Sequence, residues 1–132
     1  MGAPAAKQGD HITGTDVHIV LVPSPTGPVP TPQSLPFAGV ITGGLSTDVT
    51  IMGQAAAVAG STADNTPPHV PLTPGTAFQR PPGNRATVRG GSTTVRINGK
   101  PAARSGDPAM TCNDPADQPV GTVLATGTVM IG

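Results

Sequence analysis

Four side chains of this 132-residue chain are good ligands for a transition metal, and they are all the histidine and cysteine that the sequence contains: His11, His18, His69 and Cys112. Three imidazoles and one thiolate form a complete tetrahedral shell for Zn²⁺, which favours nitrogen and sulfur donors. A single histidine is more often an ordinary core or surface residue than a ligand, and no compact pair such as Cys-x-x-Cys is present. The prediction of a metal site therefore depends on where the rest of the chain places these four residues.

A repeated segment indicates that placement. Residues 95–107 contain Val-Arg-Ile-Asn-Gly followed by Lys-Pro-Ala-Ala-Arg-Ser-Gly-Asp. Residues 49–61 keep Val, Ile, Gly, both Ala and the last Gly in register, and residues 2–10 keep Gly, Pro, both Ala, Gly and Asp. The half that is missing before residue 2 is found at residues 128–132. The sequence thus predicts three copies, the third split across the two ends of the chain, as in a threefold ring opened within one unit.

The candidate ligands follow these copies. His18 and His69 each lie eight residues behind the last residue of their copies, and Cys112 lies five residues behind the last residue of its own. Because equivalent positions of a threefold body surround one axis, we expect these side chains to converge at one end. One Zn²⁺ with four protein ligands has no open position for water, so the predicted metal is structural. It would replace a missing apolar core at that end.

Composition limits the fold and argues against several functions. The chain has 18 Gly, 17 Pro and two Phe, with no Trp or Tyr, so neither a thick core nor long helices are expected. A net charge of zero without a basic cluster speaks against nucleic-acid binding. The longest aliphatic run, residues 19–22, is too short for a membrane span, and no secretory signal is visible, so we expect synthesis in the cytoplasm.

Short strands and turns account for the rest of the pattern. Val and Ile alternate in the first half of each copy, which gives one apolar strand face that three copies could bury together. Gly followed by Asp or Ser then ends each copy in a turn. Residues 23–36 carry six Pro and are expected to form an extended surface connection rather than a strand. The prediction is one all-β, pseudo-threefold domain over residues 1–132 with long Pro/Gly-rich loops.

The sequence Pro-Ala-Ala-Arg at residues 101–104 is the signature of the PAAR family, and the chain resembles these small cone-shaped proteins throughout its length. The resemblance implies a zinc ion near the apex, held by three His and one Cys. His11, His18, His69 and Cys112 are the only residues that could fill those places. The middle copy departs from the family pattern, since it has Ala-Ala-Ala-Val and ends in Ser61 instead of Asp.

The resemblance also implies a function without catalysis. The chain would cap and sharpen the trimeric spike of a contractile injection system, such as a type VI secretion system, a phage-like tail or an extracellular injection particle. It would aid puncture of a target membrane and could carry effector proteins. The expected partner is a trimeric spike protein, VgrG-like or phage spike-like, with one monomeric copy of this chain per trimer. Strands at residues 48–53, 94–99 and 128–132 would close the open strand edges of that needle. The particle would act outside the cell or deliver the chain into a target cell.

Two other functions stay open on the sequence. The first is a zinc hydrolase with three His on the metal and water in the fourth place. The second is a passive β-rich adaptor that carries effectors and never caps a spike. Asp10 beside His11 fits turn chemistry better than a hydrolytic site, because no nucleophile lies on a recognisable strained elbow.

Overall fold

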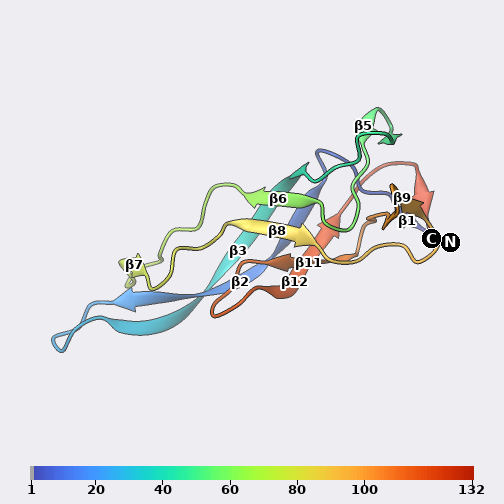
Figure 1. Ribbon diagram of the computed structural model, residues 1–132. Helices are drawn as coiled ribbons and strands as arrows, with labels where there is room; N and C mark the ends of the chain where they lie inside the picture. The colour runs from blue at the N-terminus through green and yellow to red at the C-terminus, as the bar shows by residue number, and fades with distance from the viewer. Residues whose placement is uncertain (1) are drawn as a thin grey trace.

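The structure, a computed structural model, describes residues 2–132 (Figure 1). The regular secondary structure of these residues consists of β-strands alone, which confirms the all-β prediction. No helix suited to crossing a membrane occurs among these residues. The body is elongated, with the two ends of the chain side by side at one end and a long hairpin at the other (Figure 1). The strands are β1 (Ala3–Pro4), β2 (His11–Val22), β3 (Val29–Gly43), β4 (Thr50–Ile51), β5 (Gln54–Ala55), β6 (Thr62–Asn65), β7 (Ala77–Phe78), β8 (Arg85–Val88), β9 (Arg96–Ile97), β10 (Lys100–Pro101), β11 (Pro108–Thr111), β12 (Gln118–Leu124) and β13 (Met130–Ile131).

The larger strands close into an antiparallel barrel. Their order is β12-β11-β8-β6-β3-β2, and β12 pairs with β2 to complete the circle. Burial alternates along β2 and β3, so that every second side chain points inward. Ile12, Phe37 and Ile41 are the largest apolar side chains of this interior, and most of the remainder are alanines. The barrel is therefore narrow, as a chain with two aromatic residues requires.

Three two-stranded ribbons lie at the end of the barrel where the chain begins and ends (Figure 1). β4 pairs with β5, and β9 pairs with β10, each through a tight turn with positive φ at two successive residues, Met52-Gly53 and Asn98-Gly99. The third ribbon has no turn, because it consists of β13 and β1 from opposite ends of the chain. Each copy of the repeat thus contributes one ribbon.

A ring of backbone hydrogen bonds joins the three copies. Ala6 N–H donates to the carbonyl of Ala103 (2.9 Å), Ala103 N–H to that of Ala57 (3.0 Å), and Ala57 N–H to that of Ala6 (3.0 Å). All three alanines are completely buried. Three backbones can meet this closely only where the side chains are small. The paired alanines of the repeat are therefore a packing requirement around a pseudo-threefold axis.

The turn after each alanine pair is also repeated three times. Gly9, Gly60 and Gly106 have φ angles of 94°, 100° and 93°, a region that a residue with a Cβ adopts only with strain. The next side chain accepts a hydrogen bond from the backbone N–H three residues earlier, through a carboxylate in Asp10 and Asp107 and through a hydroxyl in Ser61. Serine therefore performs the same turn-closing role in the middle copy.

The prediction that residues 23–36 form a connection rather than a strand was wrong for residues 29–36, whereas residues 23–28 do lie outside the strands. Residues 29–36 belong to β3, which pairs with β2 from Val29 to Val40. The backbone of Ala38 points away from β2, toward Asn65 and Thr66. Pro30, Pro32 and Pro36 lie an even number of residues before Ala38, so their backbone nitrogens also point away from β2. The N–H groups that proline lacks are therefore not needed for pairing with β2.

We expect Ala103→Leu to destabilise the fold by about 1–3 kcal/mol, because the larger side chain must enter a fully buried ring of backbones. Chemical denaturation measures this change. Ala116→Leu is the matched control, since Ala116 is exposed and should tolerate the same substitution. Equal stability of the two variants would contradict the packing requirement.

Candidate metal centre

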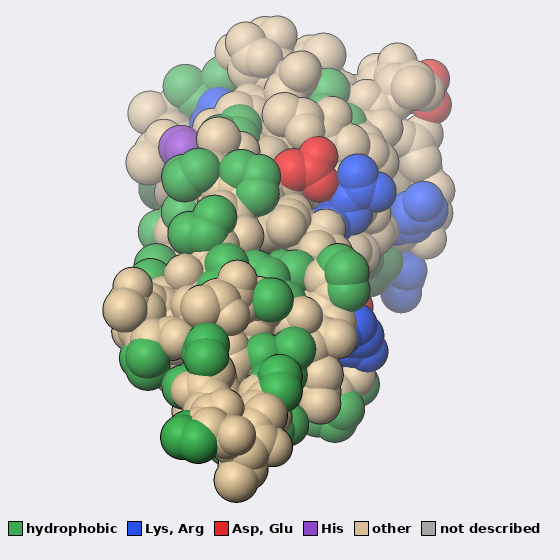
Figure 2. Space-filling view, turned by 90° about the vertical axis from the view of Figure 1, so that its left-hand side faces the viewer, with side chains coloured by type: hydrophobic (Ala, Val, Ile, Leu, Met, Phe, Trp, Pro, Cys, Tyr) green, Lys and Arg blue, Asp and Glu red, His purple; other side chains and the backbone are tan. Residues whose placement is uncertain are grey.

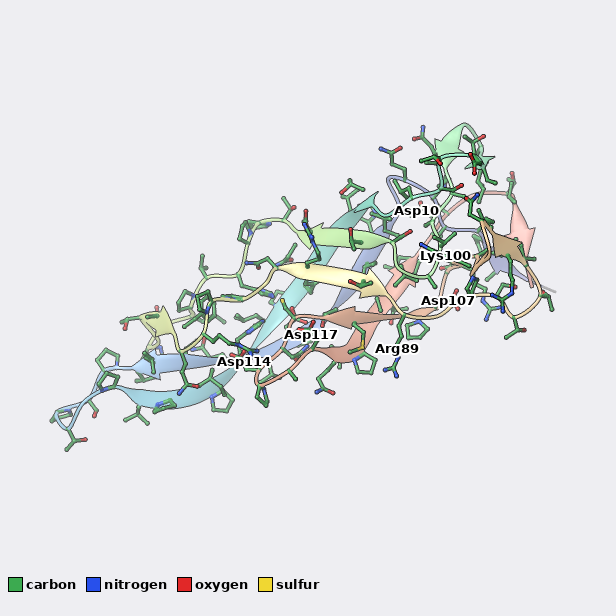
Figure 3. All side chains as sticks on the ribbon, in the orientation of Figure 1. Asp10, Arg89, Lys100, Asp107, Asp114 and Asp117 are labelled. Carbon is green, nitrogen blue, oxygen red and sulfur yellow. The ribbon has the colours of Figure 1, made fainter. Side chains whose placement is uncertain are left out.

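The site lies where β2 separates from β12. β2 pairs with β12 only at residues 11–13. Farther along, the segment after β11 takes the place of a neighbouring strand. Val17 N–H donates to Asn113 Oδ1 (2.8 Å), Ile19 N–H donates to Asp114 Oδ2 (2.9 Å), and Asp114 N–H donates to the Val17 carbonyl (2.9 Å). Figure 3 places Asp114 at this level, far from the ribbons. The segment after β11 is thus fixed beside the strand that carries the site.

Four side chains meet here: Asp16, His18 and Cys112 are buried residues, and His69 is half-buried with a side chain that is 3% exposed. Asp16 and His18 come from β2, His69 from the loop between β6 and β7, and Cys112 from the residue directly after β11. One ligand atom from each lies within 4.8 Å of the others. The four residues come from three parts of the chain, so the site joins segments that are far apart in the sequence.

Three of the four residues named from the sequence converge here, and His11 does not. His11 is exposed on β2, where its strand neighbours are Val40 and Leu124. It lies an odd number of residues before Asp16, so its side chain points to the opposite face of the strand. Asp16 occupies the place expected for the fourth ligand. Its position two residues before His18 on a strand was the signal that could have identified it.

The Asp16 carboxylate is the hub of the group. It accepts hydrogen bonds from His69 Nε2 (2.8 Å), from Cys112 Sγ (3.3 Å), and from the side chains of Thr111 and Asn113. Asp16 itself is completely buried. A buried carboxylate is costly unless donors or a cation compensate its charge. The arrangement is therefore suited to hold positive charge, whether on protons or on a metal.

His18 is the residue that a hydrogen-bond network alone leaves unexplained. Its side chain is 1% exposed, and neither ring nitrogen has a hydrogen-bond partner. Nε2 lies 4.0 Å from Asp16 Oδ2, on the side of the group. A buried polar group without a partner costs about 1–3 kcal/mol. A metal ion between the four side chains would satisfy this nitrogen, and one sulfur, two nitrogen and one oxygen donors fit Zn²⁺.

The pKa is shifted in opposite directions at Cys112, a member of the group, and at Asp114, which lies beside it. Burial, together with the charge of Asp16 and the hydrogen bond to it, raises the pKa of the Cys112 thiol to about 11. Burial also raises the pKa of Asp114, but hydrogen bonds from Ile19 N–H and from Arg80 outweigh it, so this pKa is below its ordinary value. Without a metal, Cys112 is a neutral thiol and Asp114 an anion at neutral pH.

A family model for the PAAR motif matches residues 23–114. The chain belongs to the PAAR-motif family. The match covers two complete copies of the repeat, together with His69 and Cys112. The PAAR segment at residues 2–10 and the strand at residues 128–132 lie outside the matched range. These two segments form the third copy through the ring of alanine hydrogen bonds and the β1–β13 ribbon. The comparisons found no matching curated protein and no matching solved structure.

We expect the metal-free PAAR chain to lose stability as the pH rises from about 8.5 toward 11. Below this pH range the thiol of Cys112 is protonated in both the folded and the unfolded chain. Within it the unfolded chain ionises at the ordinary cysteine pKa while the folded chain does not, which favours unfolding. Urea denaturation in the presence of a chelator measures the slope. Cys112→Ser should lack this part of the slope, and parallel curves would contradict the raised pKa.

Proposed function

We propose that this PAAR protein is a structural, non-enzymatic tip that caps the trimeric spike of a contractile injection system. The observation that carries the proposal is the pseudo-threefold end of the molecule. One chain there presents three ribbons around a ring of three equivalent alanines. A trimeric β-structured spike ends in three equivalent strand edges, and a monomer with matching symmetry can close all of them at once.

The ribbon end also carries an apolar surface suited to docking. Met52 and Met130 are 54% and 57% exposed, and Val49 and Val129, which precede them by three residues and by one, are exposed as well. Met52 Sδ lies 4.0 Å from Thr128 Oγ1, so this methionine contacts the segment that leads to Met130. Methionine and valine side chains at the centre of an interface favour association with another apolar surface.

The opposite end suits contact with a membrane during puncture. Residues 17–38 carry no Asp, Glu, Lys or Arg, and Figure 2, which looks onto this end, shows hydrophobic side chains gathered there. The backbone of β3 pairs with β2, and Pro at positions 30, 32 and 36 removes N–H donors from the free edge. Unpaired donors are costly in lipid, so the prolines reduce that cost.

The proposal includes one structural Zn²⁺ held by Asp16, His18, His69 and Cys112. When bound, the ion would link β2, the β6–β7 loop and the segment after β11, and four protein ligands would leave no place for water. The alternative hydrolase requires three His on the metal. Within residues 2–132 that set is not assembled, because His11 lies on the opposite strand face.

We expect the purified chain to bind one Zn²⁺ and its removal by a chelator to lower the melting temperature by at least about 10 °C. Structural zinc contributes on the order of 10 kcal/mol to small domains, which is as large as the stability of many of them. Cys112→Ala should lose both the metal and this stabilisation, as measured by elemental analysis and thermal melting. His11→Ala is the matched control and should retain both. A metal-free wild type, or equal loss in the two variants, would refute this site.

For the docking surface, we expect Met52→Lys combined with Met130→Lys to weaken binding to the spike trimer at least tenfold, because the interface would have to bury two charges. Val29→Lys is the control at the hairpin end, where Val29 is 46% exposed. Co-purification with light scattering should give one wild-type chain per trimer. Loss of binding only in the control would place the interface at the other end, and no binding by wild type would favour the adaptor function.

A further inference from the structure

His18 lies between two carboxylates. Its Nε2 faces Asp16 Oδ2 at 4.0 Å, and its Nδ1 faces Asp114 Oδ2 at 3.5 Å. The ring is almost completely buried, and its two nitrogens point in these two directions without a hydrogen-bond partner. One nitrogen is thus directed at the proposed metal and the other at a carboxylate outside the ligand group.

The Asp114 carboxylate is held in place from several sides. Its Oδ2 accepts a hydrogen bond from Ile19 N–H (2.9 Å), and its Oδ1 accepts from Arg80 Nε (3.1 Å) and Nη2 (2.7 Å). Arg80 Nη2 also donates to the carbonyl of Asn113 (2.9 Å). The side chain of Asp114 is 6% exposed, whereas that of Arg80 is 56% exposed. A forked guanidinium therefore closes the site from the solvent side and limits the positions that Asp114 can adopt.

We propose that Asp114 is a positioning residue that orients His18 for metal binding, and that Arg80 fixes Asp114 in that role. The inference rests on the metal site of the proposed function. A histidine that binds a metal through Nε2 keeps a proton on Nδ1, and that N–H needs an acceptor. Asp114 is the acceptor that faces this nitrogen, since its Oδ2 lies 3.5 Å from Nδ1. Its negative charge also makes the ring a stronger donor to the metal.

The second histidine of the group has no carboxylate at its outer nitrogen, which makes the role of Asp114 specific to His18. His69 Nδ1 lies 3.2 Å from Asn65 Nδ2. The oxygen of the same amide accepts a hydrogen bond from Ala38 N–H (2.9 Å), so the amide is oriented by the backbone of β3. Asn65 brings no charge to the site. Removing the charge of Asp114 should therefore change the donor strength of His18 and leave His69 as it is.

Asp114→Asn tests the proposal, because asparagine keeps the size of the side chain and an acceptor for Ile19 N–H. We expect a 10- to 100-fold weaker Zn²⁺ affinity in competition with a chromophoric chelator, the range typical of residues that orient a ligand. The visible absorption spectrum of the Co²⁺-substituted variant should also shift. Asp114→Glu should recover part of the affinity. Asp117→Asn is the matched control, since it removes the same charge from an exposed position on the same segment.

The outcomes separate this role from the metal site itself. If the wild-type chain binds neither Zn²⁺ nor Co²⁺, both the metal site and the role of Asp114 are overturned. Normal affinity and an unchanged Co²⁺ spectrum in Asp114→Asn overturn the role of Asp114 alone, even if the variant melts at a lower temperature. An equal loss in Asp117→Asn also overturns it, because the effect would then be one of net charge. If Asp114→Asn fails to fold, Arg80→Gln decides: its affinity should fall as well, and an unchanged value refutes the clamp.

Discussion

The closed circle of hydrogen bonds between Ala6, Ala57 and Ala103 is the constraint on which the rest of the structure depends. Each alanine donates to one copy of the repeat and accepts from the other, so no copy can be displaced without breaking two bonds. The circle requires three backbones in close contact, and this excludes larger side chains. It also holds the first segment of the chain against two internal ones, which places β1 where β13 can pair with it.

The two ends of the molecule are stabilised in different ways. At the ribbon end, backbone hydrogen bonds and small side chains are sufficient, because the three copies approach one another closely. At the other end β2 leaves the barrel, and the chain has few large apolar side chains to cover it. A buried polar group centred on Asp16 takes that place. Such a group stabilises the fold only when its charge is compensated, which explains why donors, and the proposed metal, surround it.

Proline has a structural use in this protein that composition alone hides. A strand that pairs on one side only leaves a free edge, which invites association with other chains. In β3 the outward positions carry Pro30, Pro32 and Pro36, so the edge has few donors to offer while the bonds to β2 remain intact. The outer edge of β3 can therefore project from the barrel without a covering strand, while β7 pairs with β2 on the other side of the hairpin. The prolines that argued against a strand in the sequence are the residues that allow the outer edge of β3 to remain exposed to solvent.

The sequence by itself determined the all-β class, the repeat and the family, because these follow from short-range patterns: alternating Val and Ile, Gly before Asp or Ser, and paired alanines. It also identified His18, His69 and Cys112 as residues that would meet. Only the tertiary structure decided that Asp16 joins them and His11 does not. That choice depends on which face of β2 turns inward, which is set by pairing with β3. The approach of Asp114 to His18 was equally hidden, because it joins residues far apart in the chain.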